Sequence, residues 1–208
     1  MDMSPEPPGA EKGRIREAVR EAVFGLSPEA RAAAGIAVRD RLLALPDFAR
    51  ARTVFTYLAL PDEVPTMPVA RAILEAGKRL ALGRVETIPK TIRAILAAGP
   101  LADPSGLEEA LVPGPFGIPE PPEGQVLPPA AIDFAIVPGR AFAPDGSRLG
   151  RGGGYFDRFL PLLRKDAILA GVAFDEQIVA ALPREIHDVA VRLVVTPTRI
   201  LGPTAGTP

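Results

Sequence analysis

The chain has 208 residues, of which 47% are hydrophobic and 24% charged, and its formal net charge at pH 7 is −1. This composition is typical of one globular domain and excludes disordered, collagen-like and coiled-coil chains. The lack of cysteine excludes disulfides, Cys-ligated zinc, iron–sulfur clusters and thiol nucleophiles, and the single histidine excludes zinc sites built on several imidazoles. The balanced charge argues against nucleic acid and membrane surfaces as partners.

Prolines mark the expected domain boundaries, because the chain holds 25 of them, more than twice the usual share of about 5%. They predict a disordered N-terminal tail (1–10), an α/β domain (11–200) with a long surface loop (113–129), and a flexible C-terminal tail (201–208). The first ten residues lack the cationic and apolar regions of a targeting peptide, and no apolar run approaches the ~18 residues of a membrane span. We therefore expect a soluble, cytoplasmic protein.

Secondary structure is predicted from hydrophobic spacing and capping residues. A first helix covers 11–25, where Gly25 ends it, and Ser27 with Pro28 predicts the start of a second helix that runs to about Leu45. Further helices are predicted over 65–76 and 154–163, and strands over 52–60, 79–85, 132–138, 167–173 and 191–196. The strands are apolar nearly throughout and alternate with helices, which predicts an α/β fold. We expect a single three-layer domain with a mostly parallel central sheet and helices on both faces.

A glycine-rich loop follows the strand predicted over 132–138. Four glycines lie within five positions, at Gly150, Gly152, Gly153 and Gly154, and three arginines flank them, at Arg148, Arg151 and Arg158. Glycines let backbone N–H groups turn towards an anion, and the N-terminus of a following helix adds partial positive charge. The spacing matches neither GxGxxG nor GxxxxGK[ST], so the choice is between an unusual phosphate loop, which we favour, and a flexible connection.

Basic residues on the first predicted helix are a second candidate site. Lys12, Arg16 and Arg20 are spaced four apart and share one helix face. They can clamp a polyphosphate, or they can form a solvated face paired with Glu17 and Glu21, which is the favoured interpretation from the residues alone.

Several single residues have two interpretations each. Glu63, just past a strand, can accept hydrogen bonds from ring N–H groups of a ligand or act as a helix-start acid. Asp157 can hold Mg²⁺ against a phosphate, or it can complement the helix dipole or pair with Arg158. Tyr155 can stack on a ligand ring or pack in the core. Gln177 can contact a ligand or cap a turn, and His187 beside an aspartate can be a base but is more often structural.

Taken together, the motifs resemble those of the 5-formyltetrahydrofolate cyclo-ligase family. The most specific is PGRAFAPDGSRLGRGGGYFDRFL, from Pro138 to Leu160. Seven more stand around it in the family's order: KGRIR, LSPEAR, YLALPDEVPT, EAGKRLALGRV, FGIPEP, GVAFDEQ and LPREIHD. The resemblance covers Lys12 to about Thr196.

The resemblance implies ATP- and Mg²⁺-dependent ring closure of 5-formyltetrahydrofolate to 5,10-methenyltetrahydrofolate. It implies an ATP site of Lys12, Arg16, Arg148, Leu149, Gly150, Arg151, Gly152, Gly153, Gly154, Tyr155 and Phe156. The reduced folate would contact Leu58, Glu63, Arg151, Gly152, Gly153, Gly154 and Tyr155, and Arg151 and Tyr155 would be the catalytic residues between the two substrates. Asp157 would take Mg²⁺. A monomer is favoured, with a dimer left open.

Four positions depart from the family's pattern. Phe156 replaces a second tyrosine, Gly83 replaces a proline, and Arg192 and Pro197 stand where an aspartate and a glutamate are usual. If the missing acid supports the metal, Mg²⁺ affinity or turnover is lower, and a non-catalytic folate or nucleotide binder is the alternative. A second alternative is an α/β enzyme acting on a sugar phosphate or CoA ester, because a fold alone does not fix chemistry.

Overall fold

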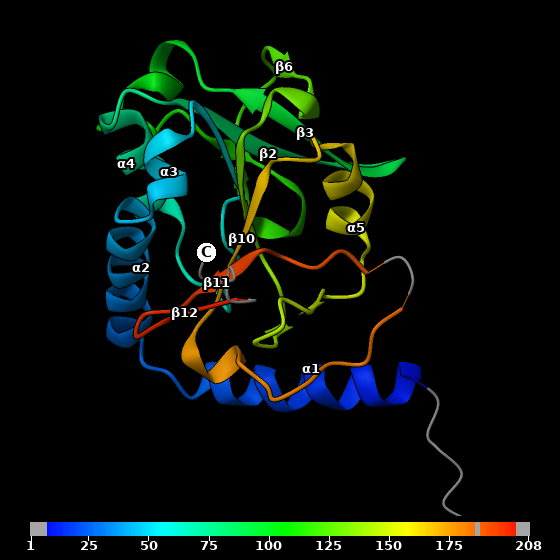
Figure 1. The fold of residues 1–208 in the computed structure, drawn as a ribbon. Coiled ribbons are helices and arrows are strands. Elements are labelled where there is room, and N and C mark those ends of the chain that lie inside the picture. The colour runs from blue at the N-terminus through cyan, green and yellow to red at the C-terminus, as the bar shows by residue number, and fades with distance from the viewer. Residues whose placement is uncertain (1–7, 186–187, 203–208) are drawn as a thin grey trace, which may run out of the picture.

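The computed structural model describes residues 8–185 and 188–202 (Figure 1). An eight-stranded sheet has the order β12-β11-β10-β7-β1-β2-β3-β6. Its five central strands are parallel: β11 (Leu193–Val195), β10 (Ile168–Val172), β7 (Phe134–Val137), β1 (Thr53–Thr56) and β2 (Arg79–Thr87). The edges are antiparallel: β12 (Ile200–Leu201), β3 (Lys90–Leu96) and β6 (Val126–Leu127). The predicted mostly parallel sheet is confirmed.

Helices cover both faces of this sheet, as the uniformly apolar strands require. On one side lie α2 (Pro28–Leu43), α3 (Pro46–Arg50) and α4 (Met67–Glu75), and on the other α5 (Tyr155–Phe159) with the 3₁₀ helix η4 (Leu160–Leu162) (Figure 1). Every residue of β1 and β7 is buried, because these strands have layers on both sides. The α/β fold class is confirmed.

The first helix lies at the end of the sheet where the parallel strands finish. α1 (Pro8–Phe24) contacts β8 (Ala141–Phe142) and the 3₁₀ helix η5 (Asp175–Gln177), which follow β7 and β10 (Figure 1). β8 pairs with β9 (Arg148–Leu149) in a separate hairpin. Ligands of parallel α/β sheets bind at the carboxyl ends of the strands. The fold therefore brings α1 to the region where a site is expected.

Capping chemistry was predicted well, and helix length less so. Ser27 Oγ accepts a hydrogen bond from the Ala30 N–H at 3.2 Å, which confirms the N-cap of α2. The helix predicted over 154–163 is wrong in length, because α5 ends at Phe159 and continues as 3₁₀ turns. Pro161 has no N–H to continue the α-helical bonding, which explains the change.

The predicted boundaries also need correction. Residues 8–10, assigned to the N-terminal tail, belong to α1, and Leu201, assigned to the C-terminal tail, belongs to β12. The rest of both tails lies outside the described residues apart from Gly202. The strand predicted over 52–60 ends at Thr56, because the chain then leaves the sheet.

The segment 113–129 is not the long surface loop that its prolines predicted. It carries the pair β4 (Val112–Pro113) and β5 (Pro119–Glu120), the 3₁₀ helix η2 (Pro115–Gly117) and the edge strand β6, with η1 (Gly99–Ala102) before it and η3 (Pro129–Ala131) at its end. The β2–β3 hairpin that precedes it was not predicted either. Proline is compatible with short edge strands, which need few N–H donors, so proline content misled the prediction.

Candidate active site

A cavity of about 380 Å³ opens at the carboxyl ends of β1 and β7. The residues after β1 supply Tyr57, Leu58, Leu60 and Glu63, β2 and β3 supply Gly83, Val85 and Ile92, and the segment after β4 supplies Phe116, Ile118, Pro119 and Glu120. The rest of the lining comes from the chain after β7 and from the glycine-rich loop: Pro138, Gly139, Arg148, Gly150, Arg151, Gly153, Gly154, Tyr155, Phe156 and Asp157. The glycine-rich loop and Glu63, which are far apart in sequence, therefore share one cavity.

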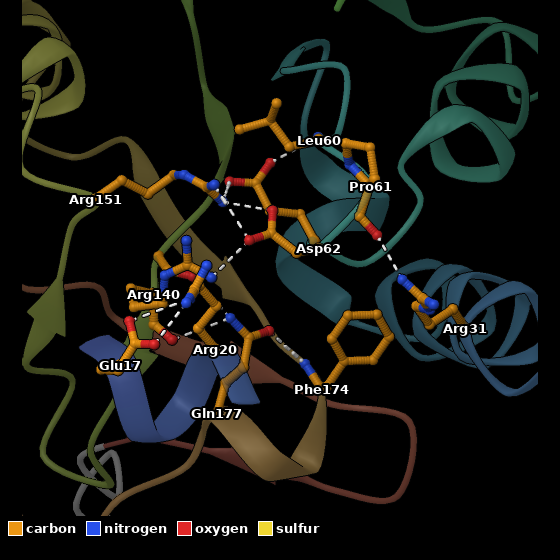
Figure 2. Close-up of polar contacts among 12 residues, drawn as sticks. Glu17, Arg20, Arg31, Leu60, Pro61, Asp62, Arg140, Arg151, Phe174 and Gln177 are labelled. Atoms are coloured by element: carbon orange, nitrogen blue, oxygen red, sulfur yellow. Dashed lines mark hydrogen bonds and ion pairs between the residues drawn. The ribbon is translucent and has the colours of Figure 1, made fainter. Parts of the chain in front are cut away.

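Asp62 lies outside the cavity lining and connects the segment after β1 to Arg140, which follows β7, and to Arg151 of the glycine-rich loop. Its carboxylate accepts hydrogen bonds from Arg151 at 2.7 and 3.2 Å and from Arg140 at 2.7 Å (Figure 2). Burial raises the pKa of Asp62, but the hydrogen bonds and charges of the two guanidinium groups outweigh it and lower that pKa overall. The carboxylate therefore stays ionised and holds Arg151 beside the cavity.

Glu63 lies in the cavity wall with its carboxylate almost fully buried. One oxygen accepts the Leu60 N–H at 3.0 Å and the other lies 3.3 Å from Arg151. Burial raises the pKa of Glu63, although the Leu60 N–H and Arg151 act against this. Because α4 starts only at Met67, the interpretation as a helix-start acid is not supported, and Glu63 instead lines the cavity.

The glycine-rich loop turns through left-handed backbone conformations, with φ of 96° at Gly152 and 68° at Gly154. Glycine adopts these angles without steric cost. Arg16 Nε of α1 donates to the Gly150 carbonyl at 2.9 Å, so the first helix holds the loop from outside. With only five residues, α5 supplies little helix dipole, and the expectation of a phosphate site rests instead on the loop amides and the flanking arginines.

The basic residues predicted on one face of α1, Lys12, Arg16 and Arg20, have different surroundings in the structure. Lys12 is buried and binds Asp188 at 2.8 Å and Glu185 at 3.0 Å. Burial lowers the pKa of Lys12, but its two acidic partners raise it overall. Arg20 pairs with Glu17 on the exposed surface, as the solvated-face interpretation predicted. Neither Lys12 nor Arg16 lines the cavity, and the same holds for Leu149 and Gly152, so their contact with ATP stays a prediction.

Asp157 is the residue expected to hold Mg²⁺. It lines the cavity, and its Oδ1 pairs with the buried Arg148. Within residues 8–185 and 188–202, no group of three or more His, Cys, Asp or Glu residues is arranged for a metal. Mg²⁺ in phosphoryl-transfer sites is often held by one or two carboxylates together with substrate phosphates. As a single carboxylate in the cavity lining, Asp157 fits a metal that arrives with a polyphosphate.

Other predicted residues have structural partners. Gln177 accepts the Phe174 N–H and donates to the carbonyls of Gly139 and Arg140, so it fastens the chain after β7 (Figure 2). The interpretation as a structural cap is therefore supported. Tyr155 faces Phe116 at the cavity, with ring centroids 6.0 Å apart. His187 lies outside the described residues.

Four polar residues in or beside the cavity were missed in the sequence, Tyr57, Asp62, Glu120 and Arg140, as were apolar lining residues such as Ile92 and Phe116. Asp62 stands beside Glu63 in the motif YLALPDEVPT, and this acidic pair was an available signal. Arg140 and Glu120 stand within quoted motifs, but nothing local indicates that Arg140 reaches Asp62 or that Glu120 is buried.

A profile of the 5-formyltetrahydrofolate cyclo-ligase family matches residues 8–197. The chain belongs to this family. The cyclo-ligase of Escherichia coli K12 is 31% identical over 185 residues, which cover 88% of this chain and 98% of that one. The mouse cyclo-ligase is 27% identical over 189 residues, covering 86% of this chain and 90% of the other.

The fold agrees with this family membership. The solution structure of 5,10-methenyltetrahydrofolate synthetase from Aquifex aeolicus aligns with a TM-score of 0.79 and 32% identity, covering 95% of both chains. The expectation of an enzyme of the ligase class is thereby confirmed, and the relatives indicate 5-formyltetrahydrofolate cyclo-ligase activity. None of the helices in the described ranges is both long and apolar enough to cross a membrane.

The family departures lie in two different places. Gly83 and Phe156 line the cavity, and the Phe156 ring packs edge-on against Tyr57. Arg192 and Pro197 flank β11 outside the lining, and the Pro197 carbonyl accepts a hydrogen bond from Arg41. The changes in charge at Arg192 and Pro197 therefore do not alter the cavity wall.

Proposed function

We propose that the protein catalyses the ATP-dependent conversion of 5-formyltetrahydrofolate to 5,10-methenyltetrahydrofolate, with release of ADP and phosphate. Family membership and the names of the relatives support the folate substrate. The observation that carries the proposal is one contact: Arg151 of the glycine-rich loop pairs with Asp62 and Glu63, so a phosphate-binding loop and a ring-binding carboxylate meet in one cavity.

In the proposed reaction, the formyl oxygen attacks the γ-phosphorus of ATP and ADP leaves. N10 of the folate then attacks the activated formyl carbon and loses its proton, and the carbon–oxygen bond breaks as phosphate departs. The reaction requires placement of charge more than acid–base chemistry. A cavity with charged groups fixed by ion pairs, in a chain without cysteine and with one histidine, suits this requirement.

Each group in the cavity has an assigned role. Glu63 accepts hydrogen bonds from ring N–H groups of the folate, and Leu58 packs beside it. Arg151 lies between folate and ATP and stabilises the transferred phosphoryl group, with Tyr155 next to it. The loop amides and Arg148 bind the remaining phosphates, and Lys12 and Arg16 support the nucleotide from α1.

Asp157 is the residue proposed to hold Mg²⁺ together with the ATP phosphates. The ion, when bound, neutralises phosphate charge and orients the polyphosphate. Arg148 keeps the Asp157 side chain turned into the cavity through its ion pair.

The test is an absorbance assay with purified protein, 5-formyltetrahydrofolate and MgATP, because the methenyl product absorbs in the near ultraviolet. We expect product and ADP in equal amounts, and none without ATP. Glu63→Ala should abolish turnover, whereas Glu108→Ala, which changes an exposed glutamate paired with Arg71, should not.

Two results would contradict the proposal. Folate binding without product or ADP would identify a non-catalytic binder. Turnover of another substrate that is insensitive both to ATP and to Glu63→Ala would identify a different α/β enzyme.

A further inference from the structure

Tyr57 is rigidly placed in the cavity wall, although no role was predicted for it. It directly follows β1, and its carbonyl accepts hydrogen bonds from Thr66 Oγ1 at 2.6 Å and Thr56 Oγ1 at 3.2 Å. Its ring packs edge-on against Phe156, with centroids 6.0 Å apart at 84°. Backbone and ring are therefore both fixed, and the hydroxyl has a set direction.

The Tyr57 hydroxyl has no hydrogen-bond partner among the described residues. The whole residue is only 6% exposed, and it lines the cavity. Buried hydroxyl groups are almost always hydrogen-bonded in folded proteins, because an unpaired one loses its interaction with water. A buried hydroxyl that lines a cavity and lacks a partner therefore indicates that a ligand bound in the cavity supplies the hydrogen-bond partner.

The charges around this hydroxyl decide what kind of partner fits. Burial and the nearby Glu63 carboxylate raise the pKa of Tyr57 well above its ordinary value, with Arg151 acting in the opposite direction. The phenol is therefore neutral and keeps its proton for donation. The Glu63 carboxylate disfavours a phosphate oxygen beside Tyr57, whereas a ring that places an acceptor next to N–H groups matches both side chains.

We propose that the Tyr57 hydroxyl donates a hydrogen bond to an acceptor atom of the reduced folate ring, beside the ring N–H groups that Glu63 accepts. Tyr57 is then a specificity-determining residue for the folate and not for ATP. This inference rests on the proposed function, because that function supplies the ring.

The experiment compares Tyr57→Phe with the wild type by calorimetric titration with 5-formyltetrahydrofolate and, separately, with MgATP. Phenylalanine keeps the ring packing and removes only the hydroxyl. We expect the affinity for the folate to fall roughly three- to tenfold, as for the loss of one neutral hydrogen bond, and the affinity for MgATP to stay unchanged. Without ligands, the melting temperature should not fall, because the hydroxyl makes no hydrogen bond to residues 8–185 or 188–202.

Thr196→Val is the matched control, since it removes a buried hydroxyl that the chain itself satisfies. Thr196 Oγ1 donates to Asp175 Oδ1 at 2.8 Å, and Thr196 does not line the cavity. This variant should have a lower melting temperature and an unchanged folate affinity. The opposite pattern of the two variants separates a ligand-binding hydroxyl from a structural one.

Several outcomes would overturn the inference. If Tyr57→Phe binds the folate as tightly as the wild type does, and the wild type turns over normally, the inference is wrong and the proposed function still holds. A fall in MgATP affinity alone reassigns the hydroxyl to the nucleotide. A wild-type protein that binds no reduced folate overturns the proposed function, and the inference falls with it.

Discussion

The two walls of the cavity are built in different ways. The charged wall has Glu63 and Arg151 in the cavity lining, and Asp62 and Arg140 support it from outside the lining; ion pairs between segments that are distant in sequence hold the four side chains together. The proline-rich wall, residues 113–121, is held by a pair of two-residue strands and by hydrogen bonds to β2. In this wall, Glu120 accepts the Val85 N–H at 3.0 Å.

This difference indicates that the two walls have different functions. Buried charges with fixed partners are oriented before a substrate arrives, which is what electrostatic catalysis requires. The proline-rich wall offers mainly apolar contacts, including the 63% exposed Phe116, and these suit the shape of a ring. Substitutions in the charged wall should therefore impair catalysis and folding more than substitutions in the proline-rich wall.

The largest effect is expected from Asp62→Asn. Loss of the carboxylate leaves Arg140 and Arg151 without their shared counter-charge, and breaking such a buried pair destabilises a protein by about 3–5 kcal/mol. Chemical denaturation should show this loss, and kcat/KM should fall more than about a hundredfold as Arg151 loses its position. Asp40→Asn, which breaks an exposed pair with Arg39, is the control and should change neither quantity appreciably.

Glu63→Gln should separate activity from stability. Turnover should fall by about ten- to a hundredfold, because ring N–H groups lose a charged acceptor. Burial raises the pKa of Glu63 in the folded protein, so folding disfavours the ionised carboxylate and wild-type stability falls as pH rises through that pKa. Glutamine should therefore raise the melting temperature at neutral pH, and this gain should shrink as the pH is lowered. A melting temperature below that of the wild type at neutral pH would contradict the explanation.

Asp157→Asn tests the proposed metal contact. The Mg²⁺ concentration for half-maximal turnover should rise roughly tenfold, because the metal loses a charged ligand. Asp166→Asn removes an exposed aspartate that pairs with Arg164, and it should leave the Mg²⁺ requirement unchanged. An unaltered requirement in Asp157→Asn would show that Asp157 serves only as the partner of Arg148.

The smallest effect is expected from Glu120→Gln in the proline-rich wall. Burial raises the pKa of Glu120, and glutamine can still accept the Val85 N–H. The KM for the folate should change less than about threefold, within the range of a single weak contact. If this variant lost as much turnover as Glu63→Gln, the two walls would share the work of catalysis and the contrast between them would fail.

Local patterns were sufficient for much of the fold. Apolar strands predicted a sheet covered on both faces, and Ser27 with Pro28 predicted the start of α2, because burial and capping leave short-range signatures. The glycine-rich loop and Glu63 were found for the same reason: their residue types and their positions after strands carry the signal. Composition misled where prolines stand in short edge strands, as in the segment 113–129.

The sequence by itself determined the α/β class, the family resemblance and about half of the residues that line the cavity. Only the tertiary structure decided which charges pair, since Asp62 meets Arg140 and Arg151, 78 and 89 residues away. It also decided that Lys12 is buried against Asp188 and that the Tyr57 hydroxyl has no partner within the described part of the chain. The physical reason is the distance along the chain over which each interaction acts. Capping and periodic burial depend on residues that are close in sequence. Ion pairs and unpaired buried groups depend on how the parallel strands bring distant segments together at their carboxyl ends.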